Sequence, residues 1–371
     1  MPDPTEPERP AARVIPASSM TTAVSPVMVE LSYDPRVNLA MQLNGVPMVK
    51  QVRVRNMTSE TLSNLTVTLF TLPSITGALE LSVPQIGPGE TFTLDGFDLP
   101  LANDLLAAQT ERESGHVHVV VRAGRRVLFA HNFPLDVLAF NEWAGPASLP
   151  DLLAAFALPG DPAVMRVLGT ARELLQGRTG DDRLEGYKHK DPQRIRAVVN
   201  AVHDGLMALD LTLLDPPAGH DRAAQRIRTP SRIVETRLGT ALDLSLYAAA
   251  CLEKIGLNPV VAVLSDHALA GVWLEDTTFQ DVSSDERSRI LRRLESGVIA
   301  LFDPAALTAR PQRSFPQACA EAESRAARAR GYEFSLDLRA ARRAGIAPLP
   351  LRSAGEGEAR QTRAVLGRGT P

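Results

Sequence analysis

Three positions in the C-terminal half of the chain have the residue types and the order of a thiol-dependent acyl-transfer site. A helix is predicted to begin at Ala241, His267 opens a predicted strand, and Asp303 ends a later one. A cysteine on the first turn of a helix is favoured as the thiolate by the helix dipole. A histidine on a neighbouring strand acts as its general base, and an aspartate fixes the imidazole tautomer. The order predicts a Cys-His-Asp triad at 241, 267 and 303, but alanine at 241 cannot attack a carbonyl.

Each residue around this predicted site also has a structural interpretation. His267 taken alone is an ordinary histidine at a strand start, and Asp303 lies in an Asp-Pro pair that commonly ends a strand. Asp243, near the start of the predicted helix, is interpreted as a carboxylate that complements the helix dipole or supports the site from behind. Asp276 and Asp281 are weaker candidates for the orienting role.

The other cysteines, histidines and arginines are predicted to have no chemical role. Cys251 lies in an apolar helix and is interpreted as core packing, and Cys319 as structural. A metal site at His116, His118 and His131 is disfavoured because no carboxylate or cysteine lies at ligand spacing. Six arginines are interpreted as a solvated helix face, with phosphate contact as the alternative: Arg325, Arg328, Arg330, Arg339, Arg342 and Arg343.

Composition excludes several classes of protein. The 371 residues are 44% hydrophobic and 22% charged, with a formal net charge of −3, which is typical of soluble globular chains. Two cysteines form neither a disulfide scaffold nor a four-cysteine zinc site, and no phosphate-binding glycine motif is present. We therefore expect no metal and no cofactor. Direct nucleic-acid binding is disfavoured by the charge, and the lack of a long apolar run or secretory leader predicts a cytoplasmic protein without membrane contact.

Hydrophobic patterning predicts an α+β chain with two folded domains between two disordered tails. Residues 1–25 and 351–371 are polar and rich in proline, glycine or arginine, so they are predicted to be disordered. Residues 26–140 are predicted to form a β-sandwich of immunoglobulin-like size, because short alternating strands are separated by frequent turn signals. Residues 141–350 are predicted to form a second domain, which begins with helices and continues as mixed helices and strands.

The second domain has a definite predicted order of elements. Helices are expected over 151–157, 162–177, 192–209, 240–255, 285–295 and 314–330. Strands are expected over 260–264, 268–274 and 298–302. The helix that begins near 240 and the strands beside 267 and 303 must therefore bring the three site positions together.

The same segments resemble a known family. They read Leu238-Gly-Thr-Ala-Leu-Asp-Leu244, Ala250-Cys-Leu-Glu253, Gly256-Leu-Asn-Pro259 and Asp266-His-Ala-Leu-Ala-Gly-Val-Trp-Leu274, followed later by Gly345-Ile-Ala-Pro-Leu-Pro350. They resemble the transglutaminase-like branch of the papain-like fold, and more narrowly the N-terminal region of bacterial superfamily 1 helicase-like proteins that carry the DUF4011 domain. That family has a cysteine where this chain has Ala241. The resemblance covers residues 26–350 and implies an oxyanion-hole amide for Gln225, which is otherwise a surface glutamine.

The resemblance leaves three functions open. The favoured one is a catalytically inactive transglutaminase- or cysteine-peptidase-like module that binds a peptide or protein partner and assists a helicase system. The first alternative is the altered form of an active cysteine peptidase or transamidase whose nucleophile is replaced by Ala241. The second alternative is a nucleic-acid-associated accessory domain of a DNA helicase. Whether the chain is an enzyme is therefore left open.

Overall fold

A computed structural model describes residues 15–16, 25–215, 224–329 and 331–351. The fold is mixed α+β, and the chain divides into two compact units, Met1–Ser148 and Leu149–Pro371. Most of the two tails predicted to be disordered lies outside the described residues. Ile15–Pro16 is an exception, because it forms strand β1 and pairs antiparallel with Leu31 and Glu30.

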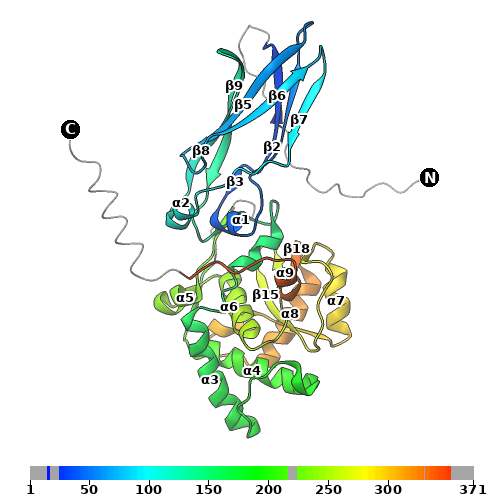
Figure 1. Ribbon diagram of the computed structural model, residues 1–371. Helices are drawn as coiled ribbons and strands as arrows, with labels where there is room; N and C mark the ends of the chain where they lie inside the picture. Colours follow the sequence, from blue (N-terminus) through cyan, green and yellow to red (C-terminus); the bar gives the residue numbers. More distant parts are fainter. Residues whose placement is uncertain (1–14, 17–24, 216–223, 330, 352–371) are drawn as a thin grey trace, which may run out of the picture. The chain divides into compact units, whose positions relative to one another are not determined.

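Unit 1 contains two β-sheets (Figure 1). The first has the order β1(Ile15–Pro16), β2(Val27–Tyr33), β4(Val49–Asn56), β7(Thr91–Asp95). The second has the order β3(Arg36–Val37), β9(Arg126–Val137), β8(Glu113–Ala123), β5(Leu62–Leu72), β6(Leu79–Ile86). Two short helices, α1(Leu39–Leu43) and α2(Asn103–Ala108), and the strand β10(Glu142–Trp143) complete the unit.

Side-chain alternation explains why these segments form strands. In β4, Val52 and Val54 are completely buried, whereas Arg53 and Arg55 are exposed. Successive side chains of a strand point to opposite faces, so this pattern buries one face of the sheet. Helix α1 was not predicted, because its segment is short and apolar. Its one helical signal is Asn38, whose side chain caps the helix by accepting from the Met41 amide.

The histidines of unit 1 do not come together. His131 pairs with Val119, which is buried, whereas His116 and His118 lie on the other face of β8. The ring of His118 stacks on Phe70 at 4.6 Å between ring centroids. Among the described residues, no group of three or more His, Cys, Asp or Glu side chains gathers as a metal ion would require.

Unit 2 is built on a five-stranded sheet. Its order is β16(Ser283–Ser284), β18(Tyr332–Asp337), β14(Pro259–Leu264), β15(Ala268–Trp273), β17(Ile299–Phe302), and all neighbours are antiparallel. The helices are α3(Pro162–Thr179), α4(Pro192–Met207), α5(Pro230–Thr236), α6(Ala241–Lys254), α7(Arg287–Glu295), α8(Phe315–Arg328) and α9(Leu338–Arg343), with 3₁₀ helices η1(Pro150–Phe156), η2(Tyr187–His189) and η4(Pro304–Thr308). Short strands are β11(Thr212–Leu213), β12(Gln225–Arg226) and β13(Leu238–Gly239).

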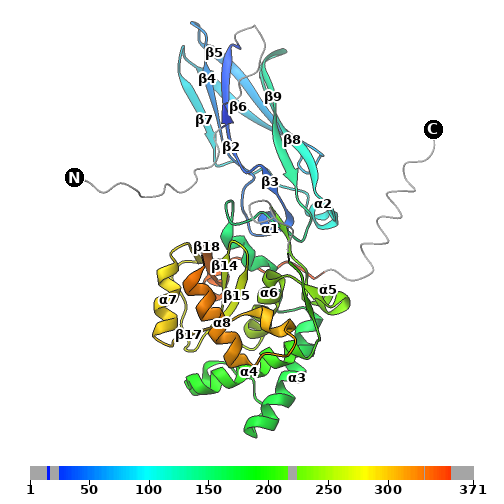
Figure 2. The same cartoon turned by 180° about the vertical axis from the view of Figure 1, so that it is seen from behind.

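Helices cover both faces of this sheet. Buried residues of α3, α4 and α6 share one hydrophobic cluster with Ala270 and Val272 of β15. The opposite face, with Leu269 and Trp273, packs against α7 and the C-terminal half of α8 (Figure 2). Both faces are therefore closed, which explains why β14 and β15 are continuous apolar runs. Among the described residues, no helix is long and apolar enough to cross a membrane.

Asp337 joins β18 to the rest of unit 2 and is completely buried. Its carboxylate accepts hydrogen bonds from the Trp273 indole, the Thr278 hydroxyl and the amides of Phe279 and Ala340. The last of these caps the start of α9. All four donors would lose their acceptor if this one side chain were removed.

We predict that Asp337→Ala lowers the free energy of unfolding by about 3–5 kcal/mol, because it leaves several buried donors unsatisfied. Urea unfolding followed by tryptophan fluorescence measures this change. The matched control is Asp276→Ala, which removes an exposed carboxylate paired with Arg339 and costs at most about 1 kcal/mol. Equal shifts for the two variants would contradict a special role of Asp337.

Candidate active site

The topology of unit 2 places His267 and Asp303 at the same end of its sheet. β14 and β15 form a hairpin whose turn, residues 265–267, lies at the start of β15. β17 runs antiparallel to β15, with Ala270 opposite Phe302, so Asp303 follows β17 at the same edge. Helix α6 joins the opposite end of β14 through residues 255–258 and packs on β15. Its N-terminal residue, Ala241, therefore lies toward the end of the sheet at which His267 is found.

His267 and Asp303 are in direct contact. The His267 Nε2 atom lies 2.7 Å from Oδ1 of Asp303. The two side chains are 9% and 1% exposed, so this hydrogen bond is shielded from water. An ionised carboxylate accepts from Nε2–H, which leaves Nδ1 as the basic nitrogen of the neutral ring.

Asp303 is held by three elements at once. Its Oδ1 atom also accepts from the Ala305 amide at the start of η4, and its Oδ2 atom accepts from Nε of Arg325 at 3.0 Å. Its own backbone amide donates to the Ala318 carbonyl of α8. Burial alone would raise the pKa of Asp303, but the hydrogen bonds and the positive charges of His267 and Arg325 outweigh it and lower the pKa. Asp303 is therefore a buried carboxylate held in its ionised form.

Ala241 occupies the first turn of α6, whose N-terminus is closed by a capping box. The Thr240 hydroxyl accepts from the Asp243 amide, and the Asp243 carboxylate accepts from the Thr240 amide. Asp243 is fully buried and also binds the amide and guanidinium of Arg228. It thus ties the segment before α5 to the helix start. Ala241 itself is 8% exposed, so a cysteine side chain in its place would be largely covered.

The remaining candidates make no contact with the imidazole. Gln225 is half-buried in β12, and its role as an oxyanion-hole amide stays a prediction. Asp276 and Asp281 are paired with Arg339 and Arg289, so neither orients the imidazole. Of the candidate orienting carboxylates Asp276, Asp281 and Asp303, only Asp303 contacts His267.

The expectation that the C-terminal arginines form a solvated face is wrong for two of them, and Arg325 is exposed as expected although it also binds Asp303. Arg339 is partly buried and binds Asp276 and Asn258. Arg342 forms a bidentate pair with Glu253 and donates to the carbonyls of Ala154, Ala157 and Ile346. Arg330 lies outside the described residues.

Arg325 was missed as a residue of the site, although its helix carries a signal. Buried residues of α8 recur at Ala318, Ala322 and Ala326. Residues three, four and seven positions apart lie on one helix face, so Arg325 flanks this buried stripe. What the sequence does not show is that Asp303 lies against that stripe.

Neither cysteine is placed to replace the missing nucleophile. Cys251 is completely buried in the apolar cluster beneath α6, and burial raises the pKa of its thiol. Burial likewise raises the pKa of Cys319 to about 12. Both thiols are therefore protonated at neutral pH, and a thiol is a weaker nucleophile than a thiolate.

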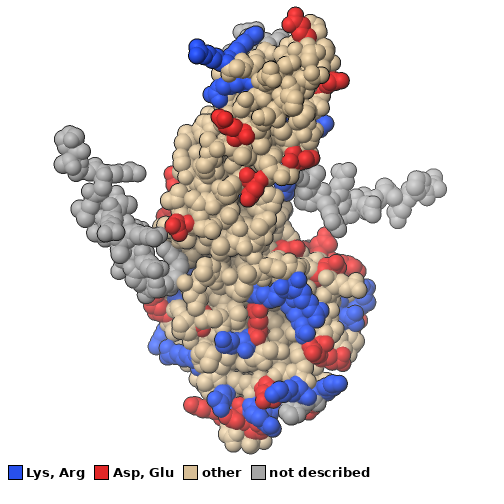
Figure 3. Space-filling view, in the orientation of Figure 1, with Lys and Arg blue, Asp and Glu red and all other residues tan. Residues whose placement is uncertain are grey.

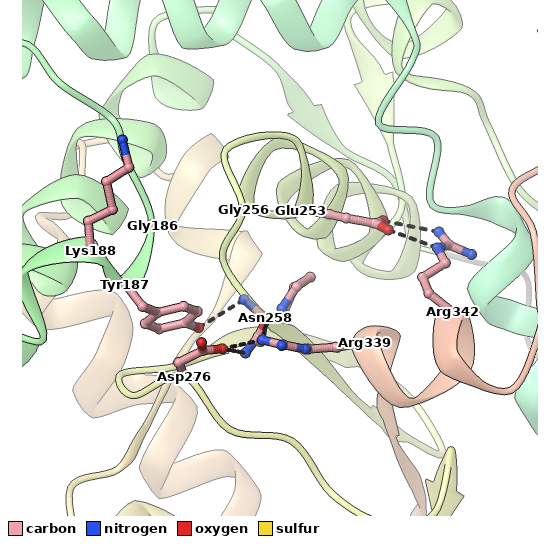
Figure 4. Close-up of a pocket in the computed structure, with 10 residues that line it drawn as sticks. Gly186, Tyr187, Lys188, Glu253, Gly256, Asn258, Asp276, Arg339 and Arg342 are labelled. Carbon is pink, nitrogen blue, oxygen red and sulfur yellow. Dashed lines mark hydrogen bonds and ion pairs between the residues drawn. The ribbon is translucent and has the colours of Figure 1, made fainter.

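Two of the cavities of unit 2 border elements of this region. One, of about 720 Å³, is bordered by the β14–β15 turn and by α8, and its Arg325 also binds Asp303. The other, of about 640 Å³, lies at the far end of α6, beside Gly256 (Figure 4). There the Arg339 and Arg342 side chains are paired with Asp276 and Glu253, which line the same cavity.

Comparison with known proteins gives little beyond these observations. No protein-family model matches the chain, and no curated protein matches it. Among solved structures, a Parabacteroides distasonis protein described as a putative protease aligns over 69% of this chain and 46% of its own, with 12% identity and a TM-score of 0.20. This chain thus spans less than half the length of that protein. The likeness is distant, and the resemblance to DUF4011 proteins stays a prediction.

We predict that Asp303→Asn lowers the free energy of unfolding by about 2–4 kcal/mol at neutral pH, because it removes a buried charge that accepts from His267, the Ala305 amide and the Arg325 guanidinium. Since folding lowers the pKa of Asp303, its stabilising contribution is present above the ordinary carboxyl pKa of about 4 and is lost as the pH falls through the folded-state value. Urea unfolding of wild type and variant at a series of pH values tests both points. The control is Asp281→Asn, an exposed carboxylate paired with Arg289. A difference that persists unchanged at acidic pH would contradict the assignment.

Proposed function

We propose that unit 2 is a transglutaminase-like (papain-like) domain that lacks its nucleophile and binds a peptide or protein partner. In this proposal unit 1 is an immunoglobulin-like β-sandwich, and the chain assists a helicase system. The helicase assignment is supported only by the sequence motifs around Ala241 and His267. The binding role is supported by the site itself.

The observation that carries the proposal is the His267–Asp303 hydrogen bond beside a helix whose first residue is alanine. A thiol-dependent acyl transferase needs a helix N-terminus that stabilises a thiolate, an imidazole nitrogen directed to the thiol, and a carboxylate behind the imidazole. The His267–Asp303 pair supports the second and third requirements, and α6 begins with a capping box. Position 241 carries no sulfur. A site of this kind can still bind a peptide but has no nucleophile that could form an acyl-enzyme.

The second candidate is an active cysteine peptidase or transamidase seen without its thiol. The His267–Asp303 hydrogen bond favours it, because a carboxylate that orients the imidazole is what a general base in such an enzyme needs. In such an enzyme the thiol proton passes to Nδ1 of His267, the sulfur adds to the carbonyl, and the leaving amine takes the proton back. The two candidates differ in whether restoring the thiol restores turnover.

We predict that Ala241→Cys creates a reactive thiol. An activated acyl ester is expected to acylate the variant at least about tenfold faster than wild type or the Ala241→Cys/His267→Ala double variant, because the imidazole removes the thiol proton. Mass spectrometry of the labelled peptide measures the rate and identifies the sulfur. Wild type, which contains only Cys251 and Cys319, is the matched background.

The outcomes of this experiment separate the candidates. Acylation that depends on His267 without peptide turnover supports an inactive binding module, and turnover of peptide amides supports the enzyme. Absence of labelling in a folded Ala241→Cys variant excludes a preserved thiol site.

We also predict that the chain does not bind DNA directly. Figure 3 shows Lys and Arg interspersed with Asp and Glu over unit 2, and Arg325, Arg339 and Arg342 are held in ion pairs. Fluorescence anisotropy with labelled single- and double-stranded DNA is expected to stay flat at every salt concentration. Binding that strengthens as salt is lowered would show phosphate contacts and favour the nucleic-acid-associated alternative.

A further inference from the structure

The cavity lined by Arg325 is bordered by two rigid elements. The β14–β15 turn supplies Ser265 and Asp266, and the Ser265 amide donates to the Gly331 carbonyl, which fixes the turn. The C-terminal half of α8 supplies Arg325 and Arg328. The volume of about 720 Å³ is in the range of small-ligand sites. Arg325, which lines this cavity, also binds Asp303 through Nε, so a ligand here is linked to the His267–Asp303 pair through that guanidinium.

The cations of this cavity are only partly neutralised. Arg313 is paired with Glu321 at 2.5 Å. Arg325 uses Nε for Asp303, and among the described residues neither of its terminal nitrogens has a partner. Arg328, three positions further along the same helix, forms no ion pair within the described part of the chain. Like charges at this spacing repel, and the negative end of the α8 dipole compensates only part of that cost.

Two neighbouring guanidinium groups are suited to a carboxylate, because the planar donors bind its two oxygens together. The wall also carries acidic side chains, Asp266 and Glu321. These acidic side chains repel a chain of phosphates. A peptide, in contrast, carries one carboxylate for the arginines and amide N–H groups that can donate to Asp266. The mixed lining therefore favours an acidic peptide over a nucleic acid.

We propose that this cavity is a subsite for an acidic residue of the bound peptide, with Arg325 and Arg328 holding its carboxylate. This inference rests on the proposed function, since it names the ligand of the same site. Arg328 is a specificity-determining residue, whereas Arg325 also positions Asp303. The carboxylate belongs either to a Glu or Asp side chain or to the C-terminus of the peptide.

The test uses the full chain and fluorescein-labelled peptide pools of alanine and glycine. The pools carry either Glu, Gln or Lys at one position, each with a free or an amidated C-terminus. We expect the Glu pools to bind at least tenfold more tightly than the Gln pools, and Arg328→Gln to reduce that ratio to near one. Arg328→Lys is expected to keep part of the preference, and Arg172→Gln, which alters a surface arginine of α3 paired with Asp182, to keep all of it. Preference for a free C-terminus over an amide, lost in Arg328→Gln, would assign the carboxylate to the chain end.

The results that overturn this inference differ from those that overturn the proposed function. Equal affinity for Glu and Gln pools, or a Glu preference that Arg328→Gln leaves unchanged, excludes the subsite while peptide binding stands. Arg328-dependent binding of an oligonucleotide assigns the cavity to nucleic acid instead. If no pool binds, both proposals fail for this cavity, and His267-dependent acylation of Ala241→Cys then decides independently whether the thiol site is preserved.

Discussion

The burial of the Asp303 carboxylate constrains the rest of unit 2. Moving a carboxylate out of water costs several kcal/mol unless its oxygens are satisfied, and otherwise the group becomes protonated. Here three donors satisfy it, from the β14–β15 turn, from η4 and from α8. The η4 donor is local, but His267 and Arg325 lie 36 and 22 residues away in the chain, so the charge is fully satisfied only when the turn and α8 are assembled around it. The predicted catalytic geometry is thus also a requirement for burying this side chain.

The stability of the fold does not depend on Ala241 in this way. An alanine at the first turn of a helix is stable without any partner, and the capping box of Thr240 and Asp243 forms whatever side chain lies at 241. In the proposed inactive domain, replacement of a cysteine by Ala241 would therefore remove the nucleophile without disturbing the fold. The His267–Asp303 pair, by contrast, has a cost when either partner is lost, so the proposal accounts for a site that keeps its histidine and aspartate without a nucleophile.

How much was predictable from the sequence depends on the range of the interactions. The start of α6 was predicted correctly because its capping residues are three positions apart, and the β14 and β15 strands because both are unbroken apolar runs. β18 was not predicted, because its buried Ser335 and Asp337 disrupt the apolar pattern. Partners far apart in the chain, such as Arg325 with Asp303, are set by packing and have no local signature beyond the flank of a buried stripe.

The arginines show how one residue type serves both structure and recognition. Arg342 uses its fork on Glu253 and three backbone carbonyls, which an ammonium group could not satisfy together. Arg325 divides its donors between Asp303 and the adjoining cavity. The same guanidinium thus holds a buried carboxylate and lines the space where the proposed acidic residue binds, so a change at Arg325 would affect both.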